Sequence, residues 1–261
     1  MDSTTAPVVR IDDAERVRTV TFNRPGQANA FDDALYWAVA DALAQAATDD
    51  GIGAVVLTGE GRTFCAGTDL VEMAAMVASL GGDDGPGPSS AGHGFLPLLE
   101  QLTTFPKPLL AAVNGPGVGL GLTMLAHCDL VVMADTARLK APFAEMGVPP
   151  EAASSYLLPR RMGAQRAALA LFTSRWISAA EAVESGLALR AVPPDRLVDE
   201  TVALAREIAA MALPALMATK RLLLDAQADG VLRARRLEDA AFADLLRGAG
   251  VEQAVLGQLD K

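Results

Sequence analysis

The chain has 261 residues, of which 51% are hydrophobic and 21% are charged, and its formal net charge is −10. This composition is typical of a globular protein with a sizeable core, and the acidic balance argues against a nucleic-acid-binding protein because phosphates would be repelled. Two cysteines and two histidines leave neither a zinc cluster nor a histidine-based catalytic triad to propose, so we expect no metal.

The first part of the chain alternates between strand-like and helix-like segments. Residues 17–22 alternate as a strand does and end at the turn signal Asn23-Arg24-Pro25-Gly26. Apolar residues then recur at helical spacing between residues 31 and 46, and the largely apolar run 54–58 is typical of a buried strand. Residues 69–80 are predicted to form a helix, with Asp69 in the first turn, where a carboxylate suits the helix dipole.

A glycine-rich stretch separates this unit from a second one with the same pattern. Residues 81–94 carry too little apolar surface to offset the entropy lost on ordering, so we expect a mobile loop, either a surface insertion or a lid over a ligand. After it we predict a strand at 109–113, a helix at 120–126 and a strand at 130–133. Strands that alternate with helices indicate βαβ crossovers and largely parallel pairing, and hence an α/β fold.

The last third of the chain is predicted to be mainly helical. Apolar residues mark helices at 164–172 and 178–185 and along the run 198–246. We therefore expect a helical addition to a core of strands and helices.

Two short stretches have the sequence of strand-to-helix turns that bind an anion. They are Phe64-Cys65-Ala66-Gly67-Thr68-Asp69 and Asn114-Gly115-Pro116-Gly117-Val118-Gly119-Leu120-Gly121. Backbone N–H groups at two helix starts provide the fixed donors that a thioester enolate oxygen requires, and small residues let a ligand approach the backbone closely. Either stretch alone is equally consistent with an ordinary turn, whereas the two together in this order favour an oxyanion hole.

The glycines of the second stretch do not match a dinucleotide-binding loop. Gly115, Gly117, Gly119 and Gly121 are spaced by two, whereas that fingerprint needs a third glycine three residues after the second. Leucine or methionine occupies the places where that glycine would fall. We therefore reject a dinucleotide-binding fold.

The order of these motifs resembles that of the crotonase family, the enoyl-CoA hydratases and isomerases, over nearly the whole chain. The matching stretches are Asn23-Arg24-Pro25 with Asn29-Ala30, residues 55–59 leading to 66–69, Lys107-Pro108 through Asn114-Gly115 to Cys128-Asp129, and Gln165-Arg166 with residues 178–182. The resemblance implies a crotonase-like spiral of repeated ββα units with the acyl-CoA site in residues 1–195, and a C-terminal helical trimerisation region in residues 196–261. It also implies a homotrimer or a dimer of trimers, with coenzyme A as the carrier part of the substrate and no separate cofactor.

The same resemblance implies the residues that contact the substrate. The oxyanion donors fall on the N–H groups of Ala66 and Leu120. The substrate-binding positions are Arg24, Ala28, Ala66, Gly67, Thr68, Asp69, Leu70, Gly119, Leu120 and Phe143. Lys220 or Arg221 is expected to meet the phosphates of coenzyme A.

The acidic residues distinguish between the reactions of the family. The two glutamates with which its hydratases activate water and deliver a proton fall on Thr123 and Phe143, and neither side chain moves a proton at neutral pH. Glu151 follows Pro149-Pro150, and isomerases of the family carry their single catalytic glutamate in a similar Pro-Glu context. Glu151 is our predicted base, with a pKa raised by an apolar pocket, and Glu145 is the second choice. Alternatively, Glu151 only stabilises the dipole of a helix start.

Three functions follow from this set of residues. We expect an enzyme that isomerises 3-enoyl-CoA to 2-enoyl-CoA in fatty acid metabolism, because a double-bond shift needs only one base. The alternatives are a hydratase that uses Glu145 or Glu151 in an altered arrangement and a catalytically silent acyl-CoA-binding trimer. No apolar run reaches the length of about 18 residues that a membrane span requires. The N-terminus has no signal-peptide pattern, so we expect a cytoplasmic protein without membrane or nucleic-acid partners.

Overall fold

A computed structural model of the chain describes residues 6–69, 72 and 94–246. Leu70, most of the helix predicted at 69–80 and nearly all of the loop predicted at 81–94 lie outside the described residues.

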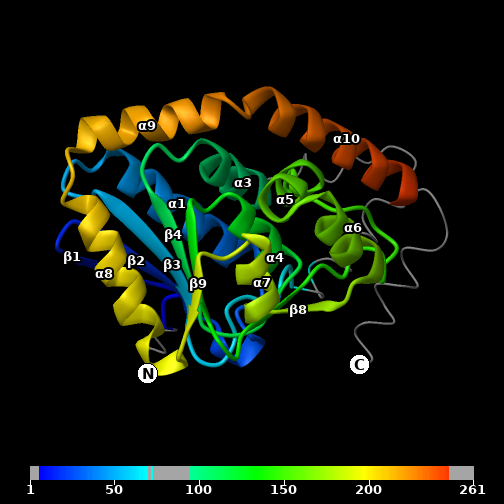
Figure 1. Cartoon of the computed structure of the whole chain (residues 1–261), viewed down its shortest axis with the longest axis horizontal. Coiled ribbons are helices and arrows are strands. Elements are labelled where there is room, and N and C mark those ends of the chain that lie inside the picture. The colour runs from blue at the N-terminus through cyan, green and yellow to red at the C-terminus, as the bar shows by residue number, and fades with distance from the viewer. Residues whose placement is uncertain (1–5, 70–71, 73–93, 247–261) are drawn as a thin grey trace, which may run out of the picture.

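The centre of the molecule is a six-stranded sheet of order β1-β2-β3-β4-β6-β9 (Figure 1). β1 pairs antiparallel with β2, and every other neighbouring pair in this sheet is parallel. Its strands are β1 (Val9–Ala14), β2 (Val17–Phe22), β3 (Ala54–Gly59), β4 (Leu109–Val113), β6 (Leu130–Ala134) and β9 (Arg190–Val192). The four strands predicted from the sequence are confirmed as β2, β3, β4 and β6, and all five residues of β4 are buried, as expected for a strand covered on both faces.

A second, three-stranded sheet of order β5-β7-β8 accounts for the repeated unit of the fold. Its strands are β5 (Gly117–Val118), β7 (Arg138–Lys140) and β8 (Trp176–Ser178). A long strand of the first sheet, a short strand of the second and a helix follow one another twice, as β4-β5-α4 and β6-β7-α5. Cys65, which follows β3, forms a parallel bridge with Gly117 and so adds to the second sheet. This mixed α/β arrangement of ββα units confirms the predicted fold class.

Helices surround the sheets, and two of them begin at a side-chain cap. α1 (Asp33–Thr48) begins after Asp32, whose side chain accepts a hydrogen bond from the N–H of Leu35. Ser178 and Glu181 form a capping box at the start of α7 (Ala179–Ser185). The other described helices of this part are α3 (Phe95–Thr104), α4 (Leu120–Thr123), α5 (Ser154–Met162) and α6 (Ala164–Thr173), with short 3-10 turns η1 (Pro25–Gln27), η2 (Met124–Ala126) and η3 (Pro194–Arg196).

The run predicted as helical from 198 to 246 consists of three helices. They are α8 (Leu197–Ala209), α9 (Leu213–Asp225) and α10 (Ala228–Leu246). Pro214 suits the first turn of α9, where a missing N–H has no intrahelical partner. α8 packs on β2, β3, β4 and β6 and so belongs to the core, whereas α9 and α10 cross the top of the molecule in Figure 1.

An ion pair and a close packing contact help attach the last two helices to the rest of the chain. Lys220 Nζ of α9 lies 2.7 and 2.6 Å from the two carboxylate oxygens of Asp129. α10 packs on α5 at Gly230, where an added Cβ would lie 2.2 Å from the ring of Tyr156. Among the described helices none is by itself long and apolar enough to cross a membrane; Pro194–Ala209 and Leu213–Asp225 meet the length and composition criteria only together, across a bend of 105°.

Candidate active site

The two turns predicted to form an oxyanion hole lie side by side. The N–H of Val118 donates to the carbonyl oxygen of Cys65 over 2.9 Å. Gly67 has a φ of +95°, and a Cβ added there would lie 2.9 Å from the carbonyl oxygen of Val118. Only a glycine permits both this backbone conformation and this close approach. The structure thus confirms that the two stretches, distant in the sequence, form one local site.

One of the two predicted donors is available and the other is not. Leu120 is the first residue of α4, and its N–H has no hydrogen-bond partner among the described residues. The N–H of Ala66, in contrast, donates to the carbonyl oxygen of Ala28 over 3.1 Å. The structure therefore corrects the assignment of Ala66 as a donor.

The available N–H of the first turn belongs to Thr68. Phe31 forms hydrogen bonds with the two residues that flank Thr68. Its N–H donates to the Gly67 carbonyl at 2.7 Å, and its carbonyl accepts from the Asp69 N–H at 2.9 Å. Successive amides of an extended segment point to opposite sides, so the N–H of Thr68 points away from Phe31. It has no hydrogen-bond partner among the described residues. Thr68 replaces Ala66 as the candidate partner of Leu120.

The turn before α1 brings several predicted substrate-binding residues to the same place. Ala28 and Asn29 adopt left-handed conformations, with φ of 51° and 54°. The buried Asn29 side chain holds this turn, because it accepts from the N–H of Arg24 at 2.9 Å and donates to the Thr63 carbonyl at 2.7 Å. This turn places the carbonyl oxygen of Ala28 next to the first glycine turn.

The guanidinium group of Arg24 is held between two carboxylates. It lies 2.9 Å from Asp32 and 3.4 Å from Asp69. Arg24, Ala28, Gly67, Thr68 and Asp69 are therefore neighbours, as the resemblance implies.

The predicted base, Glu151, lies beside the second glycine turn. Its Oε1 accepts a hydrogen bond from the hydroxyl of Thr123 over 3.1 Å. Thr123 is fully buried and lies in α4, three residues after Leu120. Thr123, which lies where the resemblance implies a glutamate, thus orients the carboxylate of Glu151.

The surroundings of Glu151 favour its protonated form more than water does. Burial raises its pKa from 4.5 to about 7, the hydrogen bond from Thr123 lowers it, and the charge of Glu238 raises it. Burial raises the pKa of Tyr36 well above 10, and the charge of Glu151 raises it further. Burial likewise raises the pKa of the Cys65 thiol to about 12, with a smaller contribution from Glu151.

Tyr36 lies next to the first turn, and the charge of Glu151 contributes to the rise of its pKa. Its hydroxyl lies 2.8 Å from Oγ1 of Thr68, the residue whose N–H is available. Glu151 therefore lies within electrostatic reach of both glycine turns, as a base acting beside an oxyanion hole must. Its pKa near 7 agrees with the rise that the sequence predicted.

The other predicted residues have separate positions. Glu145, the second-choice acid, forms an ion pair of 2.6 Å with Lys140, and its side chain is 40% exposed. Phe143 is buried and packs in the core, so its contact with substrate stays a prediction. Within the described residues no group of three or more His, Cys, Asp or Glu side chains is arranged to hold a metal ion.

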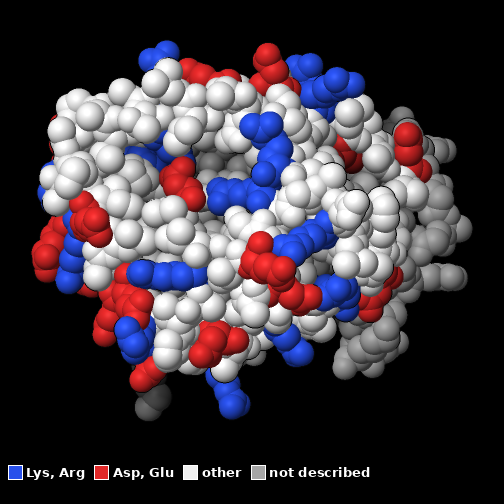
Figure 2. All heavy atoms as spheres, in the orientation of Figure 1, with Lys and Arg blue, Asp and Glu red and all other residues white. Residues whose placement is uncertain are grey.

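The two cations expected to meet phosphates differ in their surroundings. Lys220 is buried and bound to Asp129, whereas Arg221 is exposed. Lys220 lines a cavity of about 530 Å³ that also includes Arg160 and Arg161. Figure 2 shows a hollow below α9 on this face, with basic side chains gathered at its rim. Phosphate binding by Lys220 or Arg221 stays a prediction.

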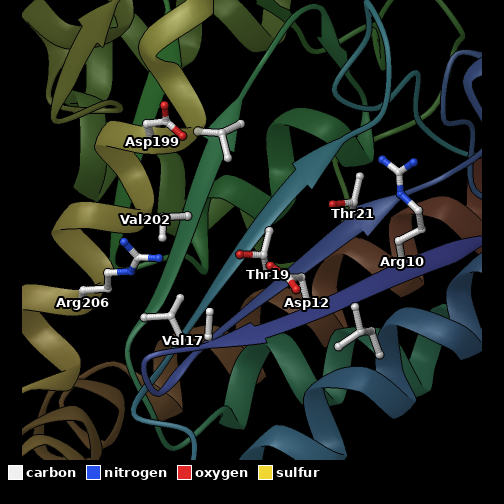
Figure 3. A pocket seen from close by; sticks show the side chains of 11 residues that line it. Arg10, Asp12, Val17, Thr19, Thr21, Asp199, Val202 and Arg206 are labelled. Carbon is white, nitrogen blue, oxygen red and sulfur yellow. The ribbon is translucent and has the colours of Figure 1, made fainter.

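A further cavity lies away from the candidate site. It has a volume of about 560 Å³ and is lined by side chains of β1, β2 and α8 (Figure 3). Its charged lining residues are Arg10, Asp12, Asp199 and Arg206, two of each sign. None of the predicted site residues lines it.

Sequence reasoning missed three side chains that shape the site: Thr123 as a hydrogen-bond donor, Tyr36, and Glu238 of α10. Glu238 accepts hydrogen bonds from the N–H groups of Ala153 at 2.7 Å and Ser155 at 2.8 Å. Thr123 was recognised only as a missing acid. No local pattern relates Tyr36 or Glu238 to Glu151, because their contacts form only in the folded chain.

Comparison with known proteins shows the same family over most of the chain. A family profile described as enoyl-CoA hydratase/isomerase matches residues 12–259. The 1,2-epoxyphenylacetyl-CoA isomerase of Escherichia coli (strain K12) is 35% identical over 74% of this chain and 72% of its own length. A probable enoyl-CoA hydratase of Rhizobium meliloti (strain 1021) is 35% identical over 87% of both chains. The crystal structure of an enoyl-CoA hydratase/isomerase from Pseudoalteromonas atlantica T6c superposes with a TM-score of 0.87 and 34% identity, covering 97% of each chain.

Proposed function

The chain belongs to the enoyl-CoA hydratase/isomerase family, and we propose that it isomerises 3-enoyl-CoA to 2-enoyl-CoA. The observation that carries the proposal is one carboxylate, Glu151, with a pKa raised to about 7, bound to Thr123 next to the available N–H of Leu120. A group with this pKa both accepts and returns a proton at neutral pH. An isomerase of this kind requires such a group and no second acid.

The proposed reaction moves one proton and no other atom of the substrate. Glu151 removes a proton from C2, and the electrons of that C–H bond form a dienolate with the charge on the thioester oxygen. The N–H groups of Leu120 and Thr68 stabilise this oxyanion. Glu151 then delivers the proton to C4, which leaves the double bond between C2 and C3. The substrate carries coenzyme A throughout, so no separate cofactor takes part.

Hydration is the less favoured reaction for this set of residues. It needs one group to activate water at C3 and another to deliver a proton at C2. Thr123 and Phe143 stand where the hydratases of the family carry these acids, and the carboxylate of Glu145 is bound to Lys140. The relatives do not decide between the reactions, because one is named an isomerase and another a probable hydratase.

We also propose that the protein assembles as a homotrimer or a dimer of trimers. Large apolar side chains are exposed on its helices, among them Phe172 at 78%, Leu222 at 71% and Leu223 at 60%. Helix faces that carry such side chains lose this exposure when they pack between subunits. Light scattering tests this proposal, and a stable monomer would contradict it.

The activity is tested by replacing each of the two candidate acids in turn. Glu151→Gln removes the base and keeps an oxygen that can accept from Thr123, so we expect kcat for 3-enoyl-CoA to fall by about 10²–10⁴-fold with little change in acyl-CoA affinity. Glu145→Gln is the matched control, because it removes the same charge from an exposed ion pair. It should leave kcat within about twofold of the parent.

Each alternative has its own result in this assay. Loss of activity in Glu145→Gln, with Glu151→Gln as active as the parent, would identify Glu145 as the base. Faster turnover of 2-enoyl-CoA to its hydration product than of 3-enoyl-CoA would favour the hydratase. A parent that binds acyl-CoA but converts neither substrate would be the silent binder.

A further inference from the structure

Glu238 of α10 places a buried carboxylate on the segment that follows the candidate base. Only 6% of the residue is exposed. Its Oε2 accepts from the N–H of Ala153 at 2.7 Å, and its Oε1 accepts from the N–H of Ser155 at 2.8 Å. Both oxygens are therefore engaged by backbone donors of one short turn, which lies far from Glu238 in the sequence.

That turn has a backbone that alanine does not adopt without support. Ala152 and Ala153, directly after Glu151, have φ of 58° and 57°. A left-handed conformation is unfavourable for any residue with a Cβ, and it persists only where surrounding contacts hold it. Glu238 supplies two such contacts, and Nε2 of His127 supplies another to the carbonyl oxygen of Ala152 over 2.8 Å.

The direction of the Glu151 side chain depends on this turn. The carbonyl oxygen of Glu151 accepts from the N–H of Ser154 over 2.9 Å, so the base is itself part of the turn. Its carboxylate is held at the other end by the hydroxyl of Thr123. A change in the backbone at Ala152 and Ala153 would therefore rotate the carboxylate away from Thr123.

We propose that Glu238 is a positioning residue for Glu151, acting through the backbone N–H groups of Ala153 and Ser155. This inference rests on the proposed function, in which Glu151 is the base. It makes α10 a required part of the active site. Without the carboxylate of Glu238, the N–H groups of Ala153 and Ser155 lose their acceptor, and a buried N–H such as that of Ala153 is costly to leave unpaired.

The groups around Glu151 give the proposal a measurable electrostatic consequence. Glu238 on α10 is the charged group that acts on the pKa of Glu151. Tyr36 of α1 and Cys65 after β3 are neutral near pH 7, because the ordinary pKa of each lies above 7 and burial raises it further. Removing the negative charge of Glu238 by itself lowers the pKa of Glu151, whereas losing the hydrogen bond from Thr123 raises it. The hydrogen bond is the larger of these two contributions, so the pKa of Glu151 should rise if its carboxylate turns away from Thr123.

The first test is Glu238→Gln, with Asp239→Asn as the control. Glutamine keeps one acceptor oxygen and turns an NH₂ group toward the second N–H, so one of the two hydrogen bonds is lost. Asp239 is the next residue of α10 and is exposed, and its replacement removes the same charge without touching the turn. We expect kcat to fall by about 10–100-fold in Glu238→Gln with KM unchanged, and neither value to move in Asp239→Asn.

A second measurement does not depend on activity. Infrared difference spectroscopy follows the carboxyl band of Glu151, identified as the band that is absent in Glu151→Gln. Its titration midpoint should rise in Glu238→Gln, because the hydrogen bond from Thr123 is lost, and stay at the parent value in Asp239→Asn. A parent without isomerase activity would refute the proposed function, while this midpoint would still decide the role of Glu238.

The results that overturn the inference are specific. A folded Glu238→Gln variant with a midpoint at or below the parent's, or with the parent's kcat in an active enzyme, would contradict it, as would equal losses in both variants. If Glu238→Gln does not fold, Ser155→Pro removes one of the two donors in the first turn of α5, where the N–H has no intrahelical partner. That variant should lose kcat with KM unchanged, and full activity in it would equally contradict the proposal.

Discussion

Replacing Glu151 by Gln should stabilise the folded protein at alkaline pH and have little effect at acid pH. The pKa of Glu151 in the folded protein is about 7, above its ordinary value of 4.5. A carboxyl group with a raised pKa favours folding while it is protonated. That contribution is fully present below pH 4.5 and is lost as the pH rises through 7.

The size of the effect follows from the same two values. Each unit of difference between the pKa of about 7 in the folded protein and the ordinary pKa of 4.5 corresponds to about 1.4 kcal/mol. Above pH 8 the ionised carboxylate therefore destabilises the folded state by about 3 kcal/mol. The glutamine side chain of the variant carries no charge and escapes this penalty. The stabilisation by Glu151→Gln should therefore be under about 1 kcal/mol at pH 5 and about 3 kcal/mol at pH 8.5.

Urea unfolding of parent and variant at these two pH values measures the effect. Both proteins are compared at one concentration, because assembly changes apparent stability. Glu145→Gln is the control, and the loss of its exposed ion pair should cost no more than about 1 kcal/mol at either pH. An equal difference between parent and Glu151→Gln at both pH values would refute the idea that burial raises the pKa of Glu151.

Three further predictions concern the donors and the docking of α9. Thr123→Val removes the hydrogen bond that lowers the pKa of Glu151, so the pH of half-maximal kcat should move upward, and an unchanged profile would contradict this contact. Leu120→Pro deletes a donor at the first position of α4, where proline is tolerated. In a variant with the parent's circular dichroism spectrum, kcat should fall by about 10²–10³-fold, and full activity would exclude this N–H from catalysis. Lys220→Met leaves the carboxylate of Asp129 without its cation and should lower the unfolding free energy by about 3–5 kcal/mol, whereas an unchanged thermal midpoint would show that the ion pair does not hold α9.

The central strands were predictable because buried strands consist of runs of apolar residues. β3 and β4 are covered on both faces, so nearly every residue in them is apolar. β1 has the sequence Val-Arg-Ile-Asp-Asp-Ala and is mostly exposed at the edge of the sheet, so it has no apolar alternation to detect. The three strands of the second sheet have two or three residues each, too few for any periodicity.

The sequence was enough to predict which segments form the candidate site, but not which N–H group of the first turn is available. Glycines and small residues indicated both turns, because a close approach of two backbones excludes a Cβ, as at Gly67 beside Val118. The choice of donor was not predictable. Ala66 and Thr68 are equally small turn residues in the sequence, and only the carbonyl oxygen of Ala28, brought in by a separate turn, shows which N–H is already bonded.

Residue types at short range were enough to predict the fold class, the two glycine turns and the single acid that follows Pro149-Pro150. The groups that surround that acid could be identified only in the folded chain. Thr123 of α4 and Glu238 of α10 act on Glu151, and Glu151 acts on Tyr36 of α1; these effects depend on distance and on the exclusion of water. Both of these are properties of the packed chain that no local pattern encodes.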